Sequence, residues 1–252
     1  MLIMKTVEET WLEEGNRAMQ GWNFEHLDGR WQNESLPWDY SKIVQKYLQP
    51  TDIWLDMDTG GGELMTSFQH DAQRTYVTEG WDSNIEFLKQ KVVPSGVTLY
   101  EDPAENLNLV PDERFDIVTN CHGAMPVPEI SRILKKSGMF ITEQIGATNN
   151  FSLSRFFRDD YQPAYPDNTL VNNAIACQKA GLKVLKSDVS FSKMSFFDVG
   201  AVVYYATVVP WEFPNFDVKD NLSKLYELQN IIEQTGQIDT YEDRFLIVAK
   251  KQ

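Results

Sequence analysis

The stretch IWLDMDTGGGELMTSF, residues 53–68, decides the fold of this chain. It begins with apolar residues and one acid, Ile53 to Asp56, as a buried strand of a parallel sheet does. Gly60–Gly62 follow, and residues 63–68 then carry apolar side chains at helical spacing. The pattern predicts a strand, a glycine turn and a helix. Glycine lets a ligand approach the main chain, and a helix start offers free N–H groups to an anionic group.

Three kinds of ligand commonly occupy such a turn. A phosphate loop needs Gly-Lys-Ser/Thr at its end, and this chain has none there. The dinucleotide motif needs a third glycine three residues after Gly62, where Met65 stands. The remaining common ligand is S-adenosylmethionine, whose amino-acid end carries a carboxylate. The alternative is a plain turn that binds nothing, which three adjacent glycines behind a strand-end acid make less favoured.

Composition indicates a globular protein that builds its core without disulfides. The 252 residues are 42% hydrophobic and 24% charged, which suits a single domain, residues 1–252. Cys121 and Cys177 form neither a disulfide framework nor a metal site by their spacing. The N-terminus lacks the apolar core of a signal peptide, and the apolar run Val199–Val209 is too short to span a bilayer. We therefore expect a cytoplasmic protein with no metal and no membrane partner.

The formal net charge is −14. A protein that binds nucleic acid usually gathers lysine and arginine on one face to meet phosphates. The densest basic cluster is only Lys135–Lys136. The charge argues against an RNA or DNA partner, although an acidic protein can carry a small basic patch.

Strands and helices alternate along the chain, which predicts an α/β fold with a doubly wound, mostly parallel seven-stranded sheet. After the strand at Ile53, strands are expected at Arg74–Thr78, Val97–Tyr100, Phe115–Thr119, Met139–Glu143, Leu182–Leu185 and Phe245–Lys250. Helices are expected at Thr6–Ala18, at Lys42–Leu48 with Ser41 as cap, at Ser83–Lys91, at Pro128–Lys136 ending at Gly138, at Asn172–Ala180 and at Leu222–Gln234. Ligands of such sheets bind beyond the carboxyl ends of the strands.

We expect four consecutive segments within this domain. They are an N-terminal helical flap (1–50), a cofactor-binding core (51–146), a substrate-side insertion after the fifth strand (147–215), and a C-terminal helix and last strand (216–252). The first segment is rich in aromatic residues: Trp11, Trp22, Phe24, Trp31, Trp38, Tyr40 and Tyr47. We favour a layer that packs these rings on the main sheet over a flap that places Trp38 or Tyr40 inside the cofactor pocket.

Four motifs in order then carry a family resemblance. Asp56-Met57-Asp58-Thr59-Gly60-Gly61-Gly62 is similar to D/E-x-G-x-G-x-G, and Glu79 follows Asp56 by twenty-three residues. Asp102-Pro103-Ala104-Glu105-Asn106-Leu107 precedes Phe115-Asp116, and RILKKSGMFI runs from Arg132 to Ile141. Over residues 50–145 the chain resembles the class I S-adenosylmethionine-dependent methyltransferases with a generic methyltransferase domain. The resemblance implies a Rossmann-like sheet and S-adenosylmethionine as cofactor.

The resemblance also implies roles for residues at the strand ends. Gly60 and Gly62 would let the main chain touch the cofactor, and Asp56 would fix the turn or the amino group of the cofactor. Glu79 would accept both ribose hydroxyls, since a carboxylate offers two acceptor oxygens. The full implied cofactor set is Asp56, Asp58, Gly60, Gly62, Glu79, Gly80, Trp81 against the adenine, Asp102, Pro103, Ala104, Asn120 and Cys121.

Asp58 departs from the family pattern, which usually has glycine at this position. Aspartate tolerates left-handed backbone angles better than most residues. Its carboxylate should nevertheless repel the carboxylate of the cofactor, so we expect modest affinity for S-adenosylmethionine.

Methyl transfer from a sulfonium is a direct displacement, in which the enzyme aligns the acceptor and shields it from water. A general base is needed only if the acceptor must lose a proton. His122, just past the fourth strand, and Glu143, the last residue of the fifth, are the candidates, with Tyr204 third. Glu143 could instead bind substrate or simply be solvated. A histidine bonded to a neighbouring backbone group is an equal alternative for His122.

Two aromatic insertions, Asn150–Tyr165 and Ser190–Trp211, are the expected substrate-facing parts. Their rings are Phe151, Phe156, Phe157, Tyr161, Phe196, Phe197, Tyr204, Tyr205 and Trp211. They would line a pocket, form a dimer surface or belong to the core, which is the commoner place for aromatic stripes.

The favoured function is a methyltransferase that acts on a small molecule. The alternatives are an RNA or protein methyltransferase and a non-catalytic S-adenosylmethionine-binding protein, and a homodimer stays open.

Overall fold

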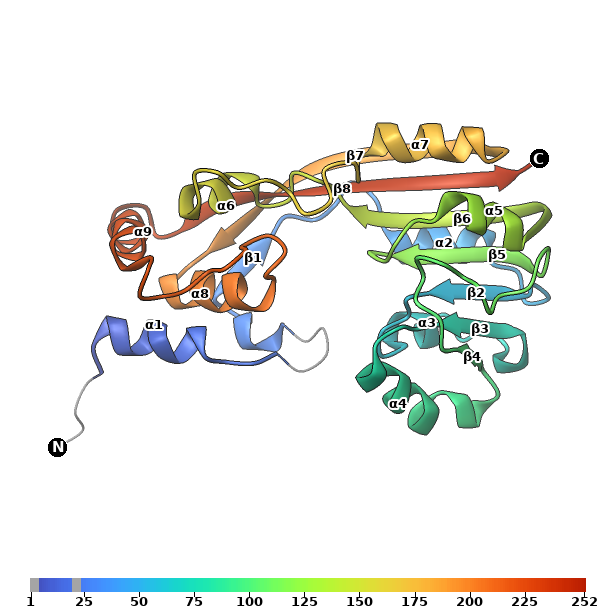
Figure 1. Cartoon of the computed structure of the whole chain (residues 1–252), viewed down its shortest axis with the longest axis horizontal. Helices are drawn as coiled ribbons and strands as arrows, with labels where there is room; N and C mark the ends of the chain where they lie inside the picture. Colours follow the sequence, from blue (N-terminus) through green and yellow to red (C-terminus); the bar gives the residue numbers. More distant parts are fainter. Residues whose placement is uncertain (1–4, 20–23) are drawn as a thin grey trace. The chain divides into compact units, whose positions relative to one another are not determined.

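The computed structural model describes residues 5–19 and 24–252, so that the predicted contribution of Trp22 lies outside the described residues. The described residues form a mixed α/β fold with an eight-stranded, mostly parallel sheet. Its strand order is β1 (Trp31–Asn33), β7 (Leu182–Phe196), β8 (Ile238–Lys251), β6 (Leu134–Ile145), β5 (Phe115–Cys121), β2 (Trp54–Met57), β3 (Thr75–Thr78) and β4 (Thr98–Tyr100) (Figure 1). The predicted fold class is confirmed.

One strand more is present than the seven predicted. The additional strand, β1, lies in the segment predicted as a helical flap and pairs antiparallel with the end of β7, from Trp31 opposite Phe196 to Asn33 opposite Met194. With only three residues, it carries too short a pattern to stand out in the sequence.

The chain divides into two compact units. Unit 1 comprises the described residues up to Leu36 with 147–167 and 190–243, and unit 2 comprises 37–146, 168–189 and 244–252. Strands β7 and β8 contribute residues to both units. The unit boundaries therefore differ from the four consecutive segments, whose assignment to cofactor and substrate roles stays a prediction.

Unit 2 contains the parallel part of the sheet. Strands β6, β5, β2, β3 and β4 pair in parallel, and β8 runs antiparallel to β6 (Figure 1). All four residues of β2 are buried, as expected for a central strand. Because the strands are parallel, their carboxyl ends lie at one edge, and the register places Cys121 opposite Glu143 there.

The helices of unit 2 are α2 (Tyr40–Tyr47), α3 (Glu63–Ser67), α4 (Asp82–Lys91), α5 (Val127–Ile133) and α7 (Leu170–Lys179). The predicted cap of α2 at Ser41 is wrong by two residues. Asp39 is the N-cap, and its Oδ1 accepts the Lys42 N–H at 2.9 Å. A carboxylate at this position also interacts favourably with the positive end of the helix dipole.

The predicted end of the helix Pro128–Lys136 is wrong. It stops at Ile133, and β6 begins at Leu134, which pairs with Phe115 of β5. Sheet pairing outweighs local helix preference here. A Cβ on Gly138 would lie 2.9 Å from the Lys135 carbonyl oxygen and 3.1 Å from that of Phe115, so this glycine permits close backbone approach rather than capping a helix.

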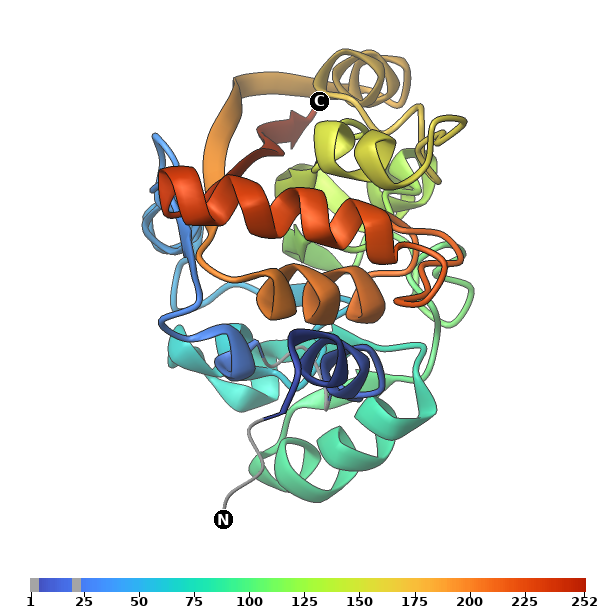
Figure 2. The same cartoon turned by 90° about the vertical axis from the view of Figure 1, so that its left-hand side faces the viewer.

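The helices of unit 1 are α1 (Val7–Gly15), α6 (Phe151–Phe157), α8 (Val199–Val208) and α9 (Leu222–Thr235), and Figure 2 shows α8 beside α9 and α1. Every residue of α8 from Val199 to Ala206 is buried. A helix that is apolar on all sides belongs inside a core. Among the residues described, none of the helices has the length and apolar character needed to cross a membrane.

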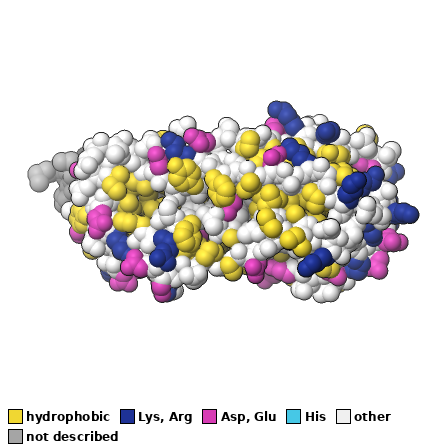
Figure 3. Space-filling view, turned by 90° about the horizontal axis from the view of Figure 1, so that it is seen from above, with side chains coloured by type: hydrophobic (Ala, Val, Ile, Leu, Met, Phe, Trp, Pro, Cys, Tyr) yellow, Lys and Arg dark blue, Asp and Glu magenta, His cyan; other side chains and the backbone are white. Residues whose placement is uncertain are grey.

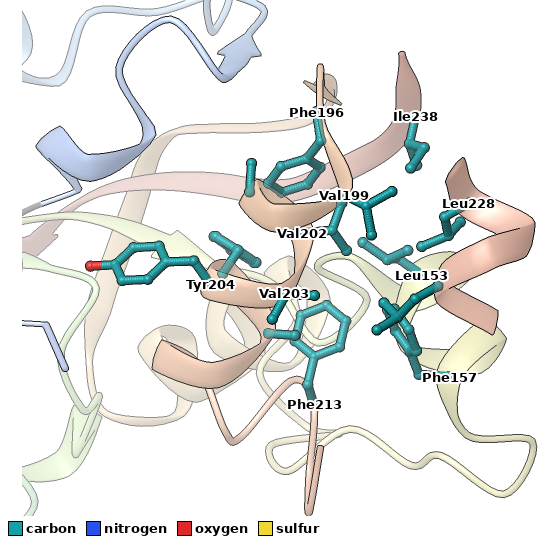
Figure 4. Close-up of a cluster of buried hydrophobic side chains, with 14 of the residues drawn as sticks. Leu153, Phe157, Phe196, Val199, Val202, Val203, Tyr204, Phe213, Leu228 and Ile238 are labelled. Carbon is teal, nitrogen blue, oxygen red and sulfur yellow. The ribbon is translucent and has the colours of Figure 1, made fainter. Parts of the chain in front are cut away.

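Most of the aromatic rings that we considered as pocket lining lie in the core of unit 1. Phe157, Phe196 and Tyr204 are buried with side chains from α6, β7, α8, α9 and β8 (Figure 4). Tyr205 belongs to the same buried cluster. A cavity of about 120 Å³ lies beside this core, lined by Ser154, Phe157, Arg158, Phe213, Pro214, Asn215, Phe216 and Asn221. Pockets for drug-sized ligands usually measure about 300–1,000 Å³. These rings therefore serve packing first.

Two phenylalanines on β7 test this assignment. Phe196 is fully buried, whereas Phe191 is exposed. Phe196→Ala should lower the free energy of unfolding by about 3–5 kcal/mol because it leaves a cavity. Phe191→Ala should change it by about 0.5 kcal/mol or less. Denaturant titration measures both values, and equal losses in the two variants would contradict the core assignment.

Candidate functional site at the strand ends

The glycine turn joins β2 to α3 as the sequence predicts. Gly60 and Gly62 have φ angles of +62° and +80°, and Gly62 is the N-cap of α3. Residues with a Cβ adopt such angles at a cost, so the turn requires glycine at both positions.

Glu79, at the end of β3, lies against this turn. Its side chain is buried, and Oε2 accepts the Gly60 N–H at 3.0 Å and the Asn84 amide at 3.2 Å. Oε1 accepts the backbone N–H groups of Gly80 and Trp81, both at 2.9 Å. Four donors therefore fix the carboxylate beside the glycine turn. This is the placement on which the predicted ribose role depends.

Asp56 connects the turn to the neighbouring strand. Its Oδ1 accepts the Thr119 hydroxyl at 2.6 Å and its Oδ2 accepts the Thr59 hydroxyl at 2.8 Å. Burial raises the pKa of Asp56 to about 6, although the two hydroxyl bonds oppose the shift. Of the two roles considered for Asp56, this geometry supplies the one that fixes the turn.

Asp58 bridges two further loops. Its φ is +49°, in the left-handed region where the family usually has glycine. Oδ1 accepts the Ala104 N–H and Oδ2 accepts the Ala124 N–H, both at 3.3 Å. A Cβ on Gly123 would lie 2.6 Å from Oδ2, so that residue must remain small for the aspartate to fit. The side chain thus takes two main-chain donors at the strand ends.

The pKa of Asp58 is raised from 3.8 to about 6. Burial is the main cause, and the charges of Glu79 and Glu105 act in the same direction. The bonds from Ala124 and Ala104 oppose the shift. The site therefore disfavours a negative charge at this position.

The loop after β4 packs against the end of β3. A Cβ on Gly80 would lie 2.8 Å from the Pro103 Cβ, so the contact requires glycine. Asp102 Oδ2 accepts the Leu109 N–H at 2.6 Å, which directs that oxygen into its own loop, and Ala104 is fully buried. Trp81 is 59% exposed, so its ring is accessible to a ligand.

Asn120 shapes the loop after β5. Its amide donates to the Ala124 carbonyl at 2.6 Å, and its Oδ1 accepts the Gly123 N–H at 2.8 Å and the Gln144 amide at 3.0 Å. Tyr40 donates its hydroxyl to the Asn120 carbonyl at 3.3 Å. Asn120 is fully buried and positions its neighbours.

His122 and Glu143 meet at the ends of β5 and β6. The His122 Nε2 lies 3.4 Å from Glu143 Oε1, and Trp38 donates its Nε1–H to Glu143 Oε2 at 2.6 Å. Burial acts to raise the pKa of Glu143, but the bonds from His122 and Trp38 and the charge of Arg244 outweigh it and lower the pKa. Cys121 stands beside them, and burial, with the charges of Glu143 and Asp56, raises the pKa of its thiol far above the ordinary value. Cys121 is therefore a thiol at neutral pH.

Sequence reasoning missed several residues that hold this site together: Thr59, Thr78, Asn84, Thr119 and Ala124. Thr78, for example, accepts the Asp58 N–H through its Oγ1 at 3.0 Å. The available signal was position, because Thr78 and Thr119 stand at or near strand ends.

A family model for a methyltransferase domain matches residues 55–142. A candidate methyltransferase from Bacillus halodurans C-125 superposes with a TM-score of 0.57 at 19% identity, covering 84% of this chain and 98% of that one. The YcgJ protein from Bacillus subtilis gives 0.57 at 16%, with the same coverage. A SAM-dependent methyltransferase from Methanosarcina mazei gives 0.53 at 14%, covering 86% and 98%. No functionally curated protein matches the sequence.

The superpositions define the class of fold, the Rossmann-like fold of methyltransferases. The methyltransferase-domain model matches residues 55–142, which span the glycine turn and the strand ends, and this agrees with the resemblance that the motifs indicated.

The raised pKa of Asp58 predicts a pH-dependent contribution to stability. An acid with a raised pKa in the folded state contributes stability at low pH that is lost as the pH rises through that pKa. The free energy of unfolding of Asp58→Asn, relative to wild type, should therefore increase between pH 4.5 and 7.5. A pH series of denaturant titrations measures it.

Asp39→Asn is the matched control. The hydrogen bonds with Lys42 lower the pKa of Asp39 below 3.8, so it stays ionised over this pH range. Its difference from wild type should be constant. A constant difference for Asp58→Asn as well would contradict the burial of its charge.

Proposed function

We propose that this chain binds S-adenosylmethionine across the ends of β2, β3 and β4 and methylates a small molecule. The observation that carries the proposal is the buried Glu79 carboxylate hydrogen-bonded to the Gly60 N–H. When bound, the cofactor supplies an electrophilic methyl group on a sulfonium sulfur. The residues present fit this ligand because an acid, a glycine turn and an accessible aromatic ring occur together.

Each part of the site has a role in holding the cofactor. Glu79 accepts a ribose hydroxyl after Oε2 exchanges the Asn84 amide for it, while the bond from the Gly60 N–H is kept. Trp81 offers an exposed ring to the adenine. The loop at Pro103 and Ala104, held against Gly80, forms the wall beside it. Aromatic rings stack on nucleobases without needing a particular hydrogen-bond pattern.

His122 and Glu143 have the role of binding the acceptor and taking its proton where it carries one. Trp38 fixes Glu143 through the bond to Oε2, and Oε1 remains directed toward His122. The His122 side chain is partly exposed, so a molecule from solvent can reach it. The acceptor contacts are supported by this arrangement at the ends of β5 and β6.

A small-molecule acceptor is supported by the charge of the chain, −14, which disfavours nucleic acid. On the face drawn in Figure 3, basic and acidic side chains are interspersed. An RNA or protein acceptor is the weaker alternative.

A second candidate function is binding of the cofactor without catalysis, and Asp58 favours it. Its carboxylate already occupies the Ala104 and Ala124 N–H groups. Turnover with no member of an acceptor panel, despite measurable cofactor binding, would support this candidate.

The proposal is tested by calorimetric titration with S-adenosylmethionine. Glu79→Ala should weaken binding at least tenfold, since a hydrogen bond to a charged group contributes about 1.5–3 kcal/mol. Glu86→Ala is the matched control, because Glu86 is an exposed acid on the neighbouring helix α4. Equal affinity in the two variants would overturn the ribose role.

Asp58→Gly should tighten binding several-fold. Glycine adopts the φ of +49° without the cost of about 1–2 kcal/mol that a Cβ brings, and the substitution removes a like charge from the ligand carboxylate. The same titration measures the effect. Weaker binding in the variant would show that Asp58 assists the cofactor rather than opposing it.

A further inference from the structure

We propose that Cys121, His122 and Glu143 bind a zinc ion at the carboxyl ends of β5 and β6. The proposal goes beyond the methyltransferase function, and its binding step does not depend on that function. Thiolate, imidazole and carboxylate are the three side-chain ligands that zinc takes in proteins.

The distances suit a single small ion. The donor atoms of the three residues all lie within 4.8 Å of one another. The His122 Nε2 is 3.4 Å from Glu143 Oε1. Zinc bonds of about 2.0–2.1 Å in a tetrahedron place a nitrogen and an oxygen ligand about 3.4 Å apart. This pair is therefore already at ligand spacing, and the Cys121 sulfur needs to approach by at most about 1.3 Å to reach the spacing of about 3.5 Å that tetrahedral zinc requires.

The backbone brings the three side chains together. Parallel pairing sets Cys121 opposite Glu143, and consecutive side chains of a strand point to opposite faces. His122 breaks that alternation with a φ of +67°, and its N–H donates to the Glu143 carbonyl at 2.9 Å. The left-handed residue thus directs the imidazole to the side of the neighbouring thiol. Such backbone conformations gather at functional sites.

Glu143 carries the support that a zinc-binding carboxylate needs. Trp38 donates to Oε2 at 2.6 Å and leaves Oε1 on the side of His122. Carboxylates that bind metals are themselves usually held by hydrogen bonds from outside the metal shell. Trp38 is buried, so this donor is fixed in place.

The charges around the site favour a cation. The negative charges of Glu143 and Asp56 act on the Cys121 thiol, and the positive charge of Arg244 opposes them. Zinc would displace the thiol proton to solvent and bind the thiolate.

Three protein ligands leave one position of the tetrahedron open, as in catalytic zinc sites. That position would hold water or an oxygen or sulfur atom of a small molecule. Only this last step rests on the proposed function. With zinc bound, His122 and Glu143 hold the metal instead of taking a proton from the acceptor, and the zinc becomes the binding point for the methyl acceptor.

Titration of the full-length protein with Co²⁺ tests the site, because cobalt replaces zinc and is visible by absorption. We expect one equivalent to bind with a thiolate-to-cobalt charge-transfer band and the visible bands of tetrahedral cobalt, both lost on adding Zn²⁺. Cys121→Ser should remove the charge-transfer band, and Glu143→Gln should weaken binding at least tenfold while leaving an oxygen for Trp38. Cys177→Ser is the control, since Cys177 lies on α7 and should leave the spectrum unchanged.

The wild-type titration is decisive even if a variant fails to fold. A wild-type protein without the tetrahedral cobalt spectrum, or folded Cys121→Ser with an unchanged spectrum, would overturn the zinc site. The Glu79→Ala protein should bind cobalt as wild type does. Loss of S-adenosylmethionine binding with intact cobalt binding would therefore separate the two proposals.

Discussion

The hydrogen bond from the Gly60 N–H to Glu79 is the contact on which the site depends. It joins the turn after β2 to the end of β3, two strands that pair directly in parallel. The other carboxylate oxygen of Glu79, Oε1, accepts the N–H of Trp81, the N-cap of α4, and so holds the start of that helix. A buried carboxylate is costly unless its oxygens are satisfied, so this network fixes both the turn and the acid. The proposed cofactor site follows from that arrangement.

A second constraint is the concentration of negative charge at the same edge. Asp56 and Asp58 both have raised pKa values, about 6, and Glu79 lies beside them. Hydrogen bonds from two threonine hydroxyls stabilise the buried carboxylate of Asp56. The carboxylate of Asp58 accepts two longer hydrogen bonds from main-chain N–H groups. The site thus combines the geometry that we propose for binding an adenosine with negative charges that oppose a carboxylate. The motif that this stretch resembles has glycine at this position, which would avoid that conflict.

Much of the fold could be predicted because buried parallel strands are recognisable in a sequence as apolar runs that end in polar residues. The positions of Gly60, Gly62 and Glu79 followed from such a pattern, and the structure brings them together. The boundary at Leu134 could not be predicted, since its pairing with Phe115 depends on a strand far away in the sequence. The same holds for Trp38 and Glu143, whose hydrogen bond joins residues 105 positions apart. Neither the left-handed φ of His122 nor the approach of Cys121 to Glu143 can be recognised from the spacing of residues in the sequence.

The central claim is that a cofactor binds beside the bond between Gly60 and Glu79. The most direct measurement follows the backbone amide signals of the isotope-labelled protein by NMR as S-adenosylmethionine is added. The account predicts that the signals of Gly60, Gly80 and Trp81 shift together, while those of Val203 and Leu228 in the core of unit 1 stay in place. Shifts confined to unit 1, or none at saturating cofactor, would contradict it.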